Sequence, residues 1–171
     1  MSVAVIMGSK SDLEIVRNAF DVLDEFGVPF TARIMSAHRT PNEAVGFAAD
    51  AEKNGCKVII CAAGMAAHLG GVVAAHTTLP VIGIPMASEP FKAMDSLLAT
   101  VQMPPGIPVA AVTCGKAGAK NAALYAISIL ATADAALAKA LKEFREKQKM
   151  QVLAADSELQ NELEARKSAK N

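Results

Sequence analysis

The chain has 171 residues, and its 17 basic and 17 acidic side chains give a formal net charge of zero at pH 7. This length fits one domain that buries roughly 70% of the surface exposed by the unfolded chain. The balanced charge and the lack of a basic block exclude the electrostatic footprint of a nucleic-acid or membrane-surface binder. An anionic partner must therefore be held locally.

Five short apolar runs predict strands, at residues 3–7, 30–35, 58–62, 81–84 and 109–113. Amphipathic or Ala-rich patterns between these runs predict helices, at residues 13–26, 41–54, 66–76 and 118–133. Strands that alternate with helices imply parallel strands joined by right-handed crossovers. We therefore expect a three-layer, flavodoxin-like α/β fold, in which a five-stranded parallel sheet carries helices on both faces.

The C-terminal part of the sequence is more polar. A charged helix is predicted from Asp134 through Phe144. We expect residues 1–147 to form a single α/β domain that includes this C-terminal helix. Residues 148–171 are expected to form a polar tail, helical or frayed, that leans on a neighbouring subunit.

Hydrophobic residues make up 52% of the chain, although aromatic residues supply only 4% and Trp is absent. Ala and Gly carry the excess. Because a small globule has limited interior, part of this apolar surface either faces other subunits or belongs to an Ala-rich core. Composition alone leaves both possibilities open.

The cysteines and histidines suggest neither a disulfide framework nor a metal site. Cys56, Cys61 and Cys114 are odd in number and form no CxxC pair, and the three His residues do not fall at metal-ligand spacings. The sequence begins with a strand-like run rather than a signal peptide, and it contains no run of eighteen apolar residues. We expect a cytoplasmic protein with no metal and no membrane contact.

Ligands of open parallel sheets bind beyond the carboxyl ends of the strands, so a binding site is expected in the loops that follow the predicted strands. The first loop, residues 8–12, contains Gly8, two Ser and Asp12, and Ser11 with Glu14 fits a capping box that starts the next helix. Free N–H groups at a helix start favour a phosphate. Taken alone, a capped turn without a ligand is the simpler interpretation.

The second loop lies at residues 36–41, where Thr40 is expected to cap a helix and Glu43 to close another capping box. This arrangement would fix His38 and Arg39 at the carboxyl end of a strand next to the first loop. A His there can shuttle protons near neutral pH, and an Arg can grip a phosphate through two hydrogen bonds. The alternative is a solvated polar loop.

The third loop, residues 63–71, contains Met65 and Leu69 and otherwise only small residues around His68. Small residues leave room for a flat ring, which His68 would contact. A His among Ala and Gly is at least as often a structural side chain, so both interpretations stay open. His76, near the end of the predicted helix, is expected to be structural or exposed.

Several segments resemble a known family. Residues 7–12 (MGSKSD), 36–41 (SAHRTP) and 66–69 (AAHL) closely resemble the N5-carboxyaminoimidazole ribonucleotide mutase family, the catalytic-subunit type of phosphoribosylaminoimidazole carboxylase. Residues 95–98, 101–104, 106–109 and 115–124 are similar to the same family, in the same order. The resemblance covers most of the chain up to about residue 133, and SAHRTP together with GSKSD is a specific signal.

The resemblance implies a homo-octameric isomerase of purine biosynthesis, without metal or organic cofactor, whose active sites lie where subunits meet. It would convert N5-carboxyaminoimidazole ribonucleotide to 4-carboxy-5-aminoimidazole ribonucleotide through trapped carbon dioxide. By position His38 is the general acid and base. Among the substrate-binding positions, the phosphate and ribose are held by Ser9, Asp12 and Arg39, with help from Ser11 and Ser36. The pocket for the imidazole and its carboxylate is lined by Ala66 and His68.

Leu13, Met65 and Gly70 depart from the family pattern, in which Trp, Gly and Pro are usual at these positions. Two other functions remain. One is a carboxylase that uses free carbon dioxide, but that branch resembles SAHKT and lacks AAHL, so Arg39 and His68 argue against it. The other is a non-catalytic flavodoxin-like binding domain, which would have no use for a His on a rigid loop.

Overall fold

Five strands form one parallel sheet in the order β2-β1-β3-β4-β5, which is the flavodoxin-like order. The structure is a computed structural model that describes residues 2–168. The strands are β1 (Ser2–Met7), β2 (Phe30–Ile34), β3 (Cys56–Gly64), β4 (Val81–Met86) and β5 (Ala110–Ala111). Every neighbouring pair runs parallel, so the carboxyl ends of all strands meet at one edge of the sheet.

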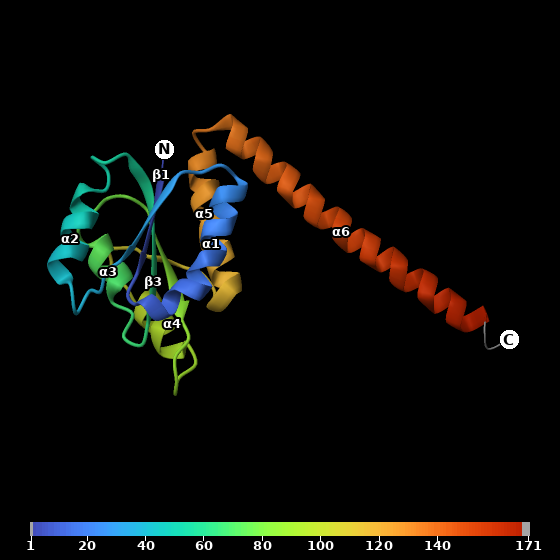
Figure 1. Cartoon of the computed structure of the whole chain (residues 1–171), viewed down its shortest axis with the longest axis horizontal. Coiled ribbons are helices and arrows are strands. Elements are labelled where there is room, and N and C mark those ends of the chain that lie inside the picture. Colours follow the sequence, from blue (N-terminus) through green and yellow to red (C-terminus); the bar gives the residue numbers. More distant parts are fainter. Residues whose placement is uncertain (1, 169–171) are drawn as a thin grey trace.

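Helices cover both faces of the sheet, as predicted (Figure 1). Helices α1 (Leu13–Glu25) and α5 (Gly115–Ala131) lie on one face. Helices α2 (Pro41–Asp50), α3 (Leu69–Ala74) and α4 (Met94–Val101) lie on the other. A 3₁₀ turn, η1 (Lys10–Asp12), joins β1 to α1. The three-layer architecture expected from the sequence is therefore confirmed.

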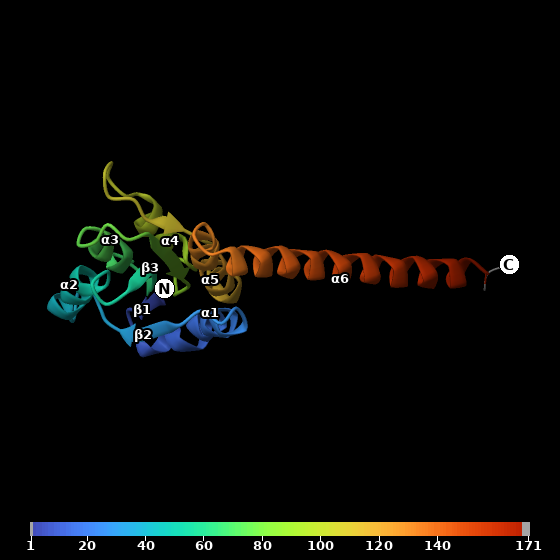
Figure 2. The same cartoon turned by 90° about the horizontal axis from the view of Figure 1, so that it is seen from above.

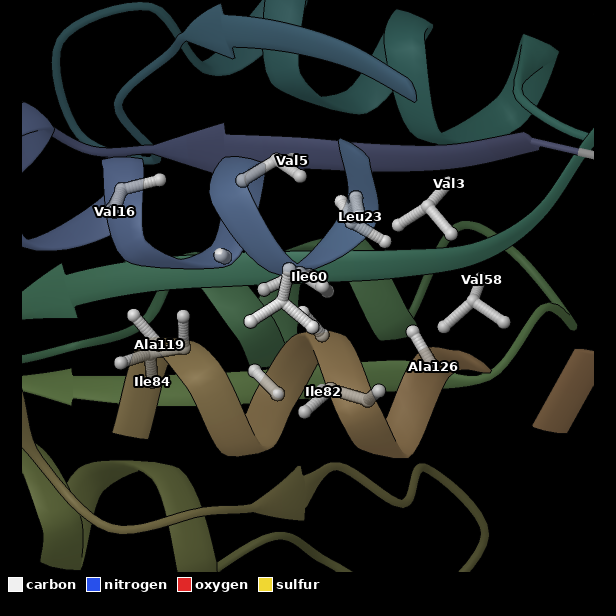
Figure 3. Close-up of a cluster of buried hydrophobic side chains, with 14 of the residues drawn as sticks. Val3, Val5, Val16, Leu23, Val58, Ile60, Ile82, Ile84, Ala119 and Ala126 are labelled. Atoms are coloured by element: carbon white, nitrogen blue, oxygen red, sulfur yellow. The ribbon is translucent and has the colours of Figure 1, made fainter. Parts of the chain in front are cut away.

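The core follows from the alternation of side chains along the buried strands. Val3 and Val5 of β1 point toward α1 and α5, whereas Ala4 and Ile6 point toward α2 and α3. Figure 3 shows the first of these clusters, in which aliphatic side chains of three strands meet small Ala side chains of α5. Each fully buried Val or Ile contributes about 1.5 to 3 kcal/mol. This packing holds the strand ends in place.

Three elements differ from the sequence prediction. Helix α4 was not predicted, and it packs close to the sheet because Gly83 has no Cβ, which would lie 2.4 Å from Thr100 Cγ2. Strand β5 contains only two residues. Helix α3 begins at Leu69 rather than at residue 66, because Met65 has a left-handed backbone and the carbonyl of Ala66 accepts the N–H of His68.

One continuous helix, α6 (Ala135–Ser168), forms the C-terminal part of the described chain. It starts at Asp134, whose carboxylate accepts the N–H groups of Ala136 and Leu137. It crosses residue 147 without a break and extends away from the domain in both views (Figures 1 and 2). The division of the chain at residue 147 stays a prediction, and residues 169–171 of the expected tail lie outside the described residues. Within residues 2–168, every helix is too short or too polar to cross a bilayer.

Candidate functional site

A cavity of about 520 Å³ lies at the carboxyl ends of β1, β2, β3 and β4. The catalytic and substrate-binding residues expected from the sequence all line it, although they come from three separate loops. They are Ser9, Ser11, Asp12, Ser36, His38, Arg39, Ala66 and His68. The parallel sheet explains this convergence, because β1 pairs with both β2 and β3, so that the three loops are neighbours.

The first loop is capped by a different residue from the one expected. Ser9, not Ser11, is the N-cap, and it forms a reciprocal capping box with Asp12. The N–H of Ser9 donates to Asp12 Oδ2 at 3.2 Å, and the N–H of Ser11 donates to Ser9 Oγ at 3.4 Å. The predicted box of Ser11 and Glu14 is wrong because a short 3₁₀ turn precedes α1 and takes the cap two residues earlier.

In the second loop, the side chain of Thr40 bonds to Ser36 at the start of the loop rather than to the helix that follows. Thr40 does occupy the N-cap position of α2, but its side chain caps no N–H of that helix, so the predicted box with Glu43 is wrong. Instead Thr40 Oγ1 accepts the N–H of Ser36 at 2.8 Å and donates to the Ser36 carbonyl at 3.2 Å. The loop is therefore a closed turn of five residues, which fixes His38 and Arg39 between its two ends.

Ser36 organises this turn from inside. Its Oγ accepts the N–H of His38 at 3.3 Å, the N–H of Arg39 at 3.2 Å and the Nε of Arg39 at 3.4 Å. The other end of the Arg39 guanidinium reaches the first loop, where Nη2 donates to the Gly8 carbonyl at 2.8 Å. Arg39 therefore joins the loops after β1 and β2, and its exposed guanidinium retains further donors for an anion.

Asp12 lies half-buried beside this guanidinium. Burial raises the pKa of the Asp12 carboxyl above its ordinary value, while hydrogen bonds from Ser9 and Ser11 and the charge of Arg39 offset part of that rise. The rim of the cavity thus holds a carboxylate, a guanidinium and two hydroxyl groups. These groups suit a ligand that carries both an anionic group and sugar hydroxyls.

The third loop turns sharply at Met65, whose φ is 55°. Gly64 precedes it and lies so close to the loop after β4 that a Cβ would be 3.3 Å from the Met86 carbonyl oxygen. Ala66 follows, and its small side chain leaves the cavity open beside His68. The loop thus presents a His and little else on one wall of the cavity.

The two cavity histidines contact each other directly. His38 Nε2 and His68 Nδ1 are 2.9 Å apart, and the ring centroids are separated by 5.1 Å with 81° between the ring planes. One nitrogen must donate and the other accept, so the contact holds a single proton between two rings. Sequence reasoning placed both residues at the site but did not predict that they bond to each other.

A fourth loop, residues 86–88, was missed by sequence reasoning. Met86, Ala87 and Ser88 follow β4 and line the cavity. Ser88 Oγ is buried without a hydrogen-bond partner among residues 2–168. The available signal was the strand order itself, because β4 pairs with β3 and its carboxyl end must lie beside the third loop.

His76 lies outside this cavity. Its exposed ring hydrogen-bonds the Val72 carbonyl at 2.8 Å, and it borders a larger cavity of about 890 Å³ at the amino end of β4. We assign function to the smaller cavity, because it alone contains the other two His residues and the Arg39 and Asp12 pair. The described part of the chain has no group of three His, Cys, Asp or Glu side chains arranged to hold a metal ion.

Fold and site together define a flavodoxin-like α/β protein with a His pair and an anion-binding loop at the carboxyl edge of its sheet. Residues 2–151 match the model of the AIR carboxylase family. Several relatives bear the name N5-carboxyaminoimidazole ribonucleotide mutase. The one from Bacillus subtilis is 52% identical and aligns over 92% of this chain and 97% of the relative. Those from Saccharolobus solfataricus and Escherichia coli are 53% and 48% identical, over 89% and 88% of this chain and 95% and 89% of the relatives.

The crystal structure of Treponema denticola PurE is also similar, with a TM-score of 0.82 and 29% identity over 92% of this chain and 97% of that chain. The chain belongs to the AIR carboxylase family. The resemblance inferred from the sequence is therefore confirmed.

Proposed function

We propose that the cavity binds N5-carboxyaminoimidazole ribonucleotide and that His38 carries the proton in its rearrangement. The chain is an isomerase of purine biosynthesis with N5-carboxyaminoimidazole ribonucleotide mutase activity, which follows from about 50% identity to mutases along almost their whole length. The observation that carries the assignment of His38 is its 2.9 Å contact with His68 inside the cavity.

The substrate phosphate and ribose are assigned to the rim formed by the first two loops. Arg39 supplies positive charge, Asp12 accepts hydrogen bonds from ribose hydroxyls, and Ser9 offers a hydroxyl. Ser11 and Ser36 assist, Ser36 chiefly by holding the turn that carries Arg39. This leaves the imidazole ring and its carboxylate for the wall that contains Ala66 and His68.

The reaction then needs only one proton carrier. His38 protonates the exocyclic nitrogen of the carbamate, whose C–N bond breaks to give carbon dioxide and aminoimidazole ribonucleotide. The enamine-like ring carbon C4 attacks carbon dioxide and forms a C–C bond. His38, now neutral, removes the proton from C4 and restores the aromatic ring. Atoms and charge balance without a co-substrate, and positioned proton transfer of this kind contributes about 10² to 10⁴-fold.

The cavity must also retain carbon dioxide between the two steps, which requires a closed wall. Met65 stands at the cavity with 65% of its surface exposed, so its flexible side chain is suited to close over a bound ring. Gly70 lies buried in α3, where a Cβ would meet Val109 Cγ1 at an ordinary 3.5 Å. Leu13 packs against the core at the start of α1. None of the three atypical residues hydrogen-bonds to His38 or Arg39.

We further propose that the protein is a cytoplasmic homo-octamer. Exposed apolar side chains support assembly, because Phe91, Met94, Leu98 and Val101 follow the cavity loop 86–88 and are 44% to 63% exposed. A patch of this kind is typical of a subunit contact. Sedimentation at micromolar concentration should give about eight times the mass of the chain. A monomer would refute the proposed assembly.

The reaction is tested with purified protein and the carbamate substrate, without ATP or added bicarbonate. The proposal predicts formation of 4-carboxy-5-aminoimidazole ribonucleotide under these conditions. If product forms only from aminoimidazole ribonucleotide and free carbon dioxide, the carboxylase alternative is correct. If neither substrate is turned over, the site is a binding site only.

A further inference from the structure

Met65 is the one long apolar side chain at the cavity that is free to move. Among the described residues that line the cavity, the long apolar side chains are those of Met65, Leu69 and Met86. Leu69 is 2% exposed and Met86 6%, and both pack inside the domain, whereas Met65 is 65% exposed. Within one chain, an apolar cover over a bound ring can therefore come only from Met65.

The backbone conformation of Met65 is one that favours glycine. Its φ of 55° lies in the left-handed region, which glycine adopts freely and which other residues adopt only at a cost in free energy. A long side chain thus stands where the backbone would be more relaxed without one. Strain of this kind is concentrated at functional sites, where the surrounding structure holds it in place.

Both neighbours of Met65 hold the strained turn at the cavity. A Cβ on Gly64 would lie 3.3 Å from the Met86 carbonyl oxygen, so the chain before Met65 packs tightly against the loop after β4. After Met65, the carbonyl of Ala66 accepts the N–H of His68 at 2.7 Å. The backbone is therefore fixed on both sides, and the torsions of the Met65 side chain are the part that can adjust.

The same turn places Met65 at the imidazole end of the cavity. His68 follows in the same loop and bonds to His38 at 2.9 Å. The groups assigned to phosphate and ribose lie on the first two loops, whereas Met65 shares the third loop with Ala66 and His68. By that assignment, Met65 lies where the carbamate releases carbon dioxide.

Carbon dioxide is a small uncharged molecule that charged groups hold only weakly. It stays in a cavity when the exit is blocked and water is excluded, and the unbranched thioether of Met fills an irregular opening well. Helix α6 does not supply this cover, because no residue of Ala135–Ser168 lines the cavity and the helix points away from α2 and α3 in Figure 2. The exposed Met65 side chain meets the requirement.

We propose that the side chain of Met65 closes the imidazole end of the cavity and retains the released carbon dioxide until C4 attacks it. Met65 forms no bond in the reaction and carries no proton. It raises the share of bound substrate that becomes product instead of aminoimidazole ribonucleotide and free carbon dioxide. Met65 has this role only if the proposed function holds, since the carbamate must bind in the cavity.

The test uses a substrate whose carbamate carbon carries a heavy-isotope label. A single turnover is run with enzyme in excess, in unlabelled bicarbonate with carbonic anhydrase, so that escaped carbon dioxide mixes at once with the unlabelled pool. Mass spectrometry then gives the share of the label that is missing from the 4-carboxy product, and a sample without enzyme corrects for spontaneous decay. Met65→Gly should raise the lost share at least about threefold over wild type, because the exit stays open.

Met65→Leu is the matched control, because it keeps both the apolar bulk and the left-handed backbone of a residue with a side chain. Its lost share should stay within about twofold of wild type. Met65→Gly should unfold at a temperature about 1 to 3 °C above wild type, since glycine relieves the backbone strain.

Equal loss of label in wild type and Met65→Gly would overturn the proposal. A loss in Met65→Leu as large as in Met65→Gly would also overturn it, because apolar bulk at this position would then have no effect. Absence of any 4-carboxy product from wild type would instead contradict the proposed function and, with it, the role of Met65.

Discussion

His38 Nε2 lies 2.9 Å from His68 Nδ1, although the two residues are 30 positions apart in sequence. The contact exists because β2 and β3 both flank β1, so that the loops after them end on the same cavity. His68 restrains the ring of His38 through this bond, and each ring lies within reach of a proton held by the other. The pair is thus the centre of the proposed chemistry.

The first prediction separates the roles of the two rings. His68→Asn keeps a hydrogen-bonding side chain beside His38 but cannot carry a proton, so it should lower turnover by less than His38→Asn does. Steady-state rates of both variants test this order. His76→Asn, outside the cavity and exposed, is the control and should retain wild-type turnover. A larger loss for His68→Asn than for His38→Asn would reverse the assignment.

The second prediction concerns the anion. Arg39→Ala should weaken ribonucleotide binding by about 1.5 to 3 kcal/mol, the size of a hydrogen bond to a charged group. The chain should still fold, because the guanidinium is exposed. Arg33→Ala removes an exposed arginine of β2 that does not line the cavity, and calorimetric titration should find its affinity unchanged. Equal affinities for both variants would place the phosphate elsewhere.

The sequence predicted the sheet, the loops and the residues of the cavity because these depend on apolar periodicity and on short motifs. Details that depend on packing were less accessible. Helix α4 was missed because the side chains that it buries are the polar Ser96 and Thr100, whereas its apolar Met94, Leu98 and Val101 are exposed. The caps failed for a different reason, since Ser9 and Thr40 bond according to the backbone around them rather than to the motif spacing.

A third prediction follows from Asp12. Burial raises the pKa of this carboxyl above its ordinary value of 3.8. At pH values between the ordinary pKa of Asp12 in the unfolded chain and its higher pKa in the folded protein, the folded state binds more protons than the unfolded state. The contribution of Asp12 to the free energy of unfolding therefore falls as the pH rises through this window. Asp12→Asn removes that cost. In denaturant titrations, the free energy of unfolding of the variant minus that of wild type should therefore be larger at neutral pH than at about pH 4. A difference that does not change with pH would contradict this account.

The fourth prediction concerns backbone packing. A Cβ on Gly118 would lie 1.7 Å from the carbonyl oxygen of Thr113, so Gly118→Ala forces α5 away from the turn that precedes it. We expect a loss of more than about 2 kcal/mol. Gly46 lies inside α2 with nothing within 4 Å of its Cβ position. Gly46→Ala should instead stabilise by about 0.5 to 1 kcal/mol. Thermal unfolding of both variants tests the contrast, and similar shifts would show that the contact at Gly118 relaxes freely.

The central claim is that His38 carries the proton in both directions. It is tested most directly by exchange of the C4 proton of aminoimidazole ribonucleotide with deuterated solvent, followed by NMR, because exchange needs the base but no carboxylate transfer. His38→Asn should bind the ribonucleotide with wild-type affinity, while both exchange and mutase turnover fall by at least about 10²-fold. Retention of wild-type exchange and turnover by this variant would show that His38 is structural, and the proton carrier would then be His68.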